Sequence, residues 1–135
     1  MGIRYIKIDA IYFVIGVSMG LYMSIVHSYT LTSVHVHVNL LGWVSMAIIG
    51  SLYYLFPSAA ASKLAKVQFW LYNIALPIMM IGLAFIVHGN EAFVPAVAAG
   101  GTVVVISVIL FAINIILNVK PSKSQGVNSG HSTSI

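Results

Sequence analysis

Four long apolar runs, separated by short polar breaks, dominate the chain. They cover residues 10–28, 34–56, 67–88 and 93–117. A helix needs about 20 consecutive apolar residues to cross the hydrocarbon core of a bilayer, and each run is close to that length or above it. A helix also satisfies its own backbone hydrogen bonds in lipid. The pattern therefore predicts an all-α fold, in which four transmembrane helices form an up-and-down bundle.

The breaks between the runs contain residues that end or begin helices. Pro57 follows the second run, Gly89 follows the third, and Pro95 falls in the first turn of the fourth. We therefore expect one transmembrane domain over residues 1–119. The segment 120–135 is rich in Ser, Gly and Asn, which predicts a disordered tail.

The composition favours a lipid environment over a soluble domain. The 135 residues are 60% hydrophobic and 6% charged, whereas soluble domains contain roughly a quarter charged residues. The chain has no cysteine, which excludes disulfides, thiolate metal sites and haem attached through a C-x-x-C-H motif. The cations flank the apolar runs in pairs and form no basic surface, so we expect membrane lipid and no nucleic acid as a partner.

The cations also predict how the bundle is oriented. An up-and-down bundle of four helices places all of them on one side of the membrane, and the positive-inside rule makes that side cytoplasmic. We therefore expect a multi-pass protein of a prokaryotic cytoplasmic (inner) membrane, with both termini in the cytoplasm. The six cations are Arg4 and Lys7, Lys63 and Lys66, and Lys120 and Lys123.

Four of the five histidines are expected together at the opposite, outer face. His27 ends the first run, His35 and His37 open the second, and His88 ends the third, whereas His131 lies in the tail. Ionisable residues at membrane depth are functional candidates by default. We interpret the four as a candidate site for a cofactor or a metal ion.

Helical spacing places three of these histidines on stripes of small and polar residues. Such residues favour helix–helix interfaces in membranes, so the stripes are expected to face inward. His37 lies about 200° around the helix from His35, and periodicity therefore selects His35 as the inward one of the pair. The stripes are Gly16, Gly20, Met23 and His27; His35, Asn39, Gly42, Met46 and Gly50; and Asn73, Pro77, Met80, Ala84 and His88.

Three segments of the second and third runs are similar to a known family. Residues 35–43 read His-Val-His-Val-Asn-Leu-Leu-Gly-Trp, and residues 52–57 read Leu-Tyr-Tyr-Leu-Phe-Pro. Both resemble the second transmembrane helix in subunit I of the haem–copper oxidase superfamily, most closely in its nitric oxide reductase and cbb3-type branches. Residues 68–71, Gln-Phe-Trp-Leu, resemble the start of that family's third helix. The chain thus looks like a truncated four-helix relative.

The resemblance implies that His37 is an axial ligand of haem b. The family's other ligand histidines lie in later helices that are not found in this sequence, so we expect no oxygen or nitric oxide reduction. The second axial ligand would be His88 or His27, or a second subunit would supply it. We expect homo-oligomers with haem near the helix interfaces. Electron transfer to a respiratory-chain partner, haem handling and gas sensing all fit this interpretation.

Two other classes of function stay open from the sequence. A copper-binding membrane protein would use the histidine cluster, above all His27, His35 and His88, with Met23 and Met46, because imidazole and thioether both suit Cu(I). A small structural or assembly subunit of a respiratory complex would instead place the histidines at a protein–protein contact. No residue pattern resembles a nucleophile–base triad, so no catalytic residue is assigned.

Overall fold

The computed structural model describes residues 1–120, which are helical almost throughout and contain no strand. Four helices are long and apolar enough to cross a membrane: Gly2–Val26, Thr32–Leu55, Lys63–Val87 and Glu91–Asn118. These helices confirm the predicted all-α class with four membrane-length helices, and they are consistent with a multi-pass membrane protein. The predicted tail lies, apart from Lys120, outside the described residues.

The second long helix is built from three segments. α2 (Thr32–His37), the π-helix η1 (Val38–Ser45) and α3 (Met46–Leu55) follow one another without a break and are called the α2–α3 helix below. The other long helices are α1 (Gly2–Val26), α5 (Lys63–Val87) and α6 (Val94–Asn118), which the short η2 (Glu91–Phe93) precedes. α4 (Pro57–Ala60) is a single turn between α3 and α5.

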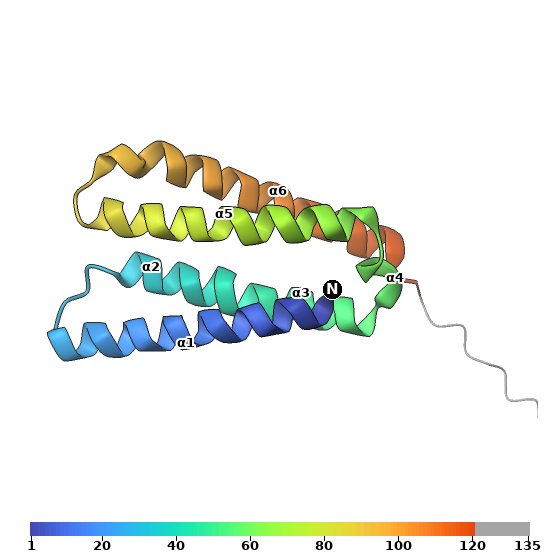
Figure 1. Ribbon diagram of the computed structural model, residues 1–135, viewed down its shortest axis with the longest axis horizontal. Coiled ribbons are helices and arrows are strands. Elements are labelled where there is room, and N and C mark those ends of the chain that lie inside the picture. The colour runs from blue at the N-terminus through green and yellow to red at the C-terminus, as the bar shows by residue number, and fades with distance from the viewer. Residues whose placement is uncertain (121–135) are drawn as a thin grey trace, which may run out of the picture.

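The long helices form two antiparallel pairs that lie against each other. α1 packs along the α2–α3 helix, and α5 packs along α6 (Figure 1). The N-terminus, α4 and the end of α6 lie at one end of the molecule, whereas the α1–α2 and α5–η2 connections lie at the other (Figure 1). We call the first the cationic end, because it carries Arg4, Lys7, Lys63, Lys66 and Lys120. The other is called the histidine end.

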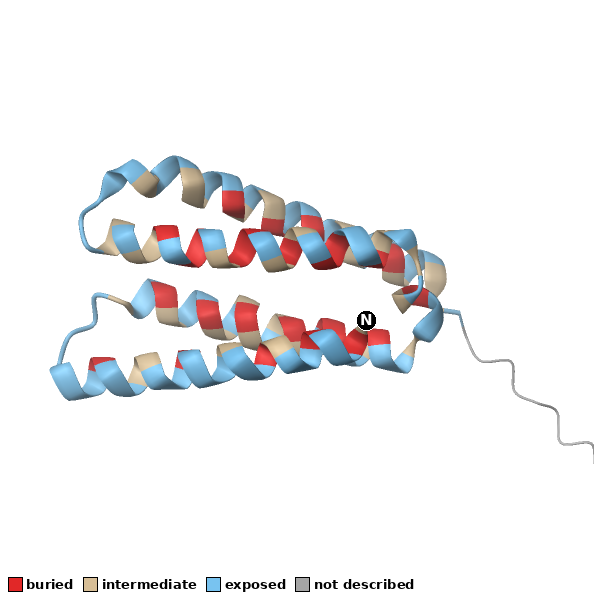
Figure 2. Ribbon diagram, viewed as in Figure 1, coloured by how far each residue is buried: buried red, intermediate tan, exposed pale blue. Residues whose placement is uncertain are grey.

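The centre of the molecule lies between α5 and the α2–α3 helix. In each of these two helices, 33% of the residues in the most apolar 18-residue stretch are buried. The corresponding share is 17% in the long helices that contain α1 and α6. Figure 2 shows the same contrast, with buried residues along α5 and long exposed stretches on α1 and α6. Most of the apolar surface of α1 and α6 is therefore left to face lipid, as expected for a bundle whose solvent is the bilayer.

Small residues allow α1 to approach the α2–α3 helix closely, as the predicted stripes require. A Cβ atom on Gly16 would lie 2.5 Å from Oδ1 of Asn39, and one on Gly20 would lie 3.0 Å from the ring of His35. A Cβ atom on Gly42 would overlap an aromatic ring of α1. The inward orientation predicted for these stripes is therefore confirmed along the body of both helices.

α1 begins at Gly2, well before the predicted start at residue 10. An apolar run marks the part of a helix that suits hydrocarbon, and the helix itself can continue beyond it into the polar interface. The backbone N–H of Arg4 donates to the carbonyl of Met1 over 3.0 Å. A Cβ atom on Gly2 would lie 2.6 Å from the carbonyl oxygen of Gly50. The first turn of α1 is thus held against α3.

Local capping explains where the α5 and α6 helices begin and end. The side chain of Ser62 accepts a hydrogen bond from the first turn of α5, as N-cap residues do. Gly89 follows α5 with a positive φ of 90°, a conformation that glycine adopts without steric cost. Asn90 caps η2, and α6 carries Pro95 in its first turn. The predicted breaks at Gly89 and Pro95 are therefore confirmed.

Candidate functional site

The four candidate histidines lie toward the histidine end, but in different local settings. His35 is partly buried, whereas His27, His37 and His88 are exposed. His27 follows the last turn of α1 with φ 50°, and His88 follows the last turn of α5. Periodicity placed both on inward stripes, and this expectation is wrong. Each helix ends one residue earlier, so both residues stand at helix ends, where their side chains are exposed and not covered by a neighbouring helix.

His35 packs against α1, as its stripe predicted. Its Nδ1 atom lies 2.9 Å from the carbonyl oxygen of Gly16. A carbonyl oxygen can only accept, so Nδ1 carries the proton and donates. The side-chain amide of Asn39 donates to the carbonyl of His35 itself over 2.8 Å. This network fixes the ring of His35 between α1 and the α2–α3 helix.

His37 occupies the opposite side of the same helix. Its Nδ1 atom lies 2.7 Å from the carbonyl oxygen of Ser33. The side chain lines an apolar groove of about 330 Å³, together with Leu41 of η1, Met79 of α5 and Gly101 of α6. His37 therefore faces a cleft in the exposed surface of the bundle, away from α1.

The same hydrogen-bond pattern occurs at His88. Its Nδ1 atom lies 2.7 Å from the carbonyl oxygen of Ala84, one turn earlier. His35, His37 and His88 thus all donate Nδ1–H to a backbone carbonyl, which leaves the lone pair on Nε2. Metal-ligating histidines are usually held in this way, with the other ring N–H bound to a carbonyl or a carboxylate. In a neutral imidazole held in this way, Nε2 is the nitrogen that is available to a metal ion.

The single chain does not gather these side chains into one cluster. Within residues 1–120, no three His, Asp or Glu side chains lie close enough together to hold a metal ion. Of the methionines in the copper hypothesis, Met23 is buried in α1 and Met46 is buried in α3. Met46 follows His35 by 11 residues, or roughly 15 Å along a helix. These two side chains cannot share a metal ion.

The π-helix η1 was not expected from the sequence, and it begins directly after His37. π-Helices are rare, and short ones are often found at functional sites. Side chains stabilise this one by donating to its carbonyl groups. Ser45 Oγ donates to the Leu40 carbonyl over 2.7 Å, and Tyr72 Oη donates to the Leu41 carbonyl over 3.0 Å. η1 sets the rotation of the histidine-bearing α2 relative to α3.

A buried polar network toward the cationic end was also missed. Tyr5 Oη donates to Gln68 Oε1 over 2.6 Å, and Asn114 Nδ2 lies 3.1 Å from the hydroxyl of Tyr53. These four residues belong to all four long helices, and the side chains of Gln68 and Asn114 are fully buried. Gln68 Nε2 has no hydrogen-bond partner among residues 1–120. The available signal was the presence of polar residues inside apolar runs.

No protein-family model, curated protein or solved structure matches the chain.

Proposed function

We propose that the protein binds haem b within the membrane at its histidine end, with His37 as one axial ligand. The main support is the setting of His37. The Ser33 carbonyl holds its Nδ1–H, so Nε2 is free to donate a lone pair. The side chain is exposed and borders an apolar groove. A flat, largely apolar macrocycle suits such a surface, and the resemblance of residues 35–43 to a haem-binding helix independently selects the same histidine.

A second copy of the chain would supply the second histidine ligand, its own His37. The residues that line the groove include no other histidine. His35 cannot contribute from the same chain, because its ring packs against Gly20 of α1. Most oligomers are symmetric, and a twofold axis presents the same surface twice. A pair of copies that meet along the groove would supply one His37 from each side.

The polar edge of the haem would face the α1–α2 and α5–η2 connections. The described residues at the histidine end include no Lys or Arg. Neutral donors would therefore have to hold the haem propionates, such as the hydroxyl of the exposed Tyr29 and the amide of Asn90. Binding would then depend mainly on the two imidazoles and on the apolar groove.

A haem with two histidine ligands supplies one-electron chemistry. The imidazole rings of this chain would keep the iron coordinated in both oxidation states, and the groove would keep water from it. Electron transfer with a respiratory-chain partner is therefore the role that the proposal favours over gas sensing or haem handling, because both of those need a ligand that leaves the iron.

An optical spectrum of the detergent-purified protein tests the proposal. The protein should be expressed with added haem precursor and measured first oxidised and then reduced with dithionite. We expect the sharp absorption bands of a reduced b-type haem. Extraction and quantification of the haem should give one haem for every two chains. A featureless spectrum from folded, haem-supplied protein would reject haem binding, and copper and zinc analysis of the same sample would then test the metal-ion alternative.

Single alanine variants identify the ligands. His37→Ala should abolish the haem bands, whereas His35→Ala should keep them, because the ring of His35 serves the contact between α1 and α2. His35→Ala is the matched control, since it removes an imidazole two residues away on the same helix. Loss of the bands in His88→Ala or His27→Ala as well would show that the second ligand comes from within one chain. Retention of the bands in His37→Ala would refute the assignment of His37.

A further inference from the structure

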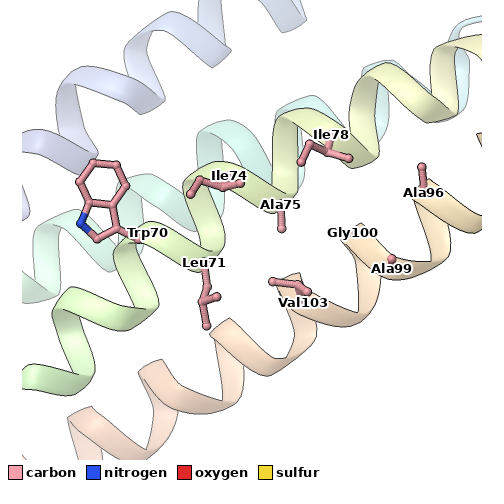
Figure 3. A pocket seen from close by; sticks show the side chains of 9 residues that line it. All are labelled: Trp70, Leu71, Ile74, Ala75, Ile78, Ala96, Ala99, Gly100 and Val103. Carbon is pink, nitrogen blue, oxygen red and sulfur yellow. The ribbon is translucent and has the colours of Figure 1, made fainter.

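Two surface grooves meet at Trp70 on α5, nearer to the cationic end of the molecule. One groove, of about 310 Å³, lies between α5 and α6, and its lining is almost entirely apolar. It extends from Trp70 to Ile78, or about 12 Å along the helix. Figure 3 shows the α5 side chains along one side of it and the small residues Ala96, Ala99 and Gly100 of α6 along the other.

The other groove lies between α5 and α1. Its lining is almost entirely apolar as well, and two cationic residues of α1 stand at its rim. It encloses about 460 Å³ and is lined by Arg4, Lys7 and Ile8 of α1 and by Phe69, Trp70 and Asn73 of α5. Arg4 and Lys7 are three residues apart, so they lie on one face of the helix. Both side chains are exposed. The rim thus places two positive charges beside an exposed tryptophan.

Asp9 does not neutralise this rim. Asp9 is the acidic residue nearest to these cations in the sequence, but it is 7% exposed, whereas both cations are exposed. Asp9 follows Lys7 by two residues and Arg4 by five, which places it about 200° and 140° around the helix from them. The charges of Arg4 and Lys7 therefore remain available to a ligand.

We propose that these two grooves bind one anionic phospholipid. Its phosphate lies against Arg4 and Lys7, and one acyl chain follows the apolar groove between α5 and α6. Basic pockets between transmembrane helices are known to suit anionic lipid headgroups, and tryptophan is enriched at the depth where headgroup and chain meet. The charge of the rim, the apolar lining of the adjoining groove and the position of Trp70 between them all fit this one occupant. The inference needs the membrane-spanning fold and is independent of haem.

Quenching of tryptophan fluorescence by brominated lipids tests the site directly. The sequence has two tryptophans, and Trp43 packs against Phe13 at a tilt, with ring centroids 4.0 Å apart. A Trp43→Phe background leaves Trp70 as the reporter. In vesicles of phosphatidylcholine, we expect phosphatidylglycerol with a brominated acyl chain to quench Trp70 at about a tenfold lower mole fraction than brominated phosphatidylcholine, given the attraction of two cations near the surface.

Two double variants of equal charge separate the site from a general surface effect. Arg4→Gln with Lys7→Gln should reduce the preference for the anionic lipid to within about twofold. Lys63→Gln with Lys66→Gln removes the same charge at the same end, outside the groove, and should leave the preference intact. Equal loss in both variants, no loss in the first, or no anionic preference in the parent would each overturn the proposal.

A third variant tests the acyl-chain groove without touching the charges. Ala99 lines the groove and is exposed, so Ala99→Phe should fill the groove without disturbing the core. We expect weaker quenching by both brominated lipids, with the preference for the anionic lipid retained. Unchanged quenching by both lipids would show that the chain does not lie between α5 and α6 and would overturn this assignment. Far-UV circular dichroism of each variant in the same vesicles verifies that it is folded.

Discussion

Replacement of Asn114 by leucine is expected to destabilise the bundle by about 2–3 kcal/mol. The Asn114 amide donates to the hydroxyl of Tyr53 over 3.1 Å and to the carbonyl of Ala59 over 3.0 Å. Its carbonyl oxygen accepts from Ser62 and from Asn118, both over 2.7 Å. Side-chain hydrogen bonds between membrane helices contribute about 0.6 kcal/mol each on average. Three of the bonds leave α6 and the one from Asn118 lies within it, so four bonds of about this strength give this range. Leucine has a similar size and leaves no large cavity.

Unfolding in mixed micelles measures this loss. The fraction of dodecyl sulfate that unfolds half of the protein, followed by far-UV circular dichroism, should fall clearly in Asn114→Leu. Asn118→Leu is the matched control on the same helix, because the Asn118 amide bonds only to Asn114 in the described chain. This control should lose about 1 kcal/mol or less. If the two variants unfold at the same detergent fraction, the buried network does not hold the cationic end together.

Further predictions concern the helix contacts around η1. Gly42→Ala should cost about 1–3 kcal/mol of stability, because the new methyl group would overlap the ring of Tyr12. Gly101→Ala is the control, since its methyl group would meet only the flexible sulfur of Met79, at 3.3 Å. Its free energy of unfolding should stay within about 0.5 kcal/mol of that of the parent. Tyr72→Phe removes the donor to a carbonyl of η1 and should lower stability by about 0.5–1.5 kcal/mol. Both comparisons use the same detergent titration, and an unchanged midpoint in Gly42→Ala would refute the close contact.

The sequence predicted the parts of this fold that depend on composition and local spacing. Four apolar runs gave four helices, because only a helix satisfies the backbone of such a run in lipid. The stripe through Gly16 and Gly20 correctly predicted which face of α1 packs against the α2–α3 helix, since only small residues permit the two helices to come so close. Gly89 marked the end of α5 because of its positive φ.

Other features depend on contacts that no local pattern contains. The start of α1 at Gly2 follows from packing against Gly50, which lies far away in the sequence. The exposure of His27 and His88 follows from where the helices end, because no neighbouring helix covers a side chain at that position. One hydrogen bond to the π-helix comes from the hydroxyl of Tyr72, which lies on another helix. The residue pattern of a single helix does not contain the information that determines these features.

The separation of charge along the molecule limits how two copies can meet in one membrane. The described cations, Arg4, Lys7, Lys63, Lys66 and Lys120, all lie at one end. Moving one elementary charge against a potential of 100 mV costs about 2.3 kcal/mol, so inverting a copy would cost on the order of 10 kcal/mol from the potential alone. Two copies that formed the proposed pair would therefore share one orientation, and their twofold axis would run along the membrane normal. Such an axis would place both His37 rings at one depth, so that the proposed haem between them would stand upright in the bilayer.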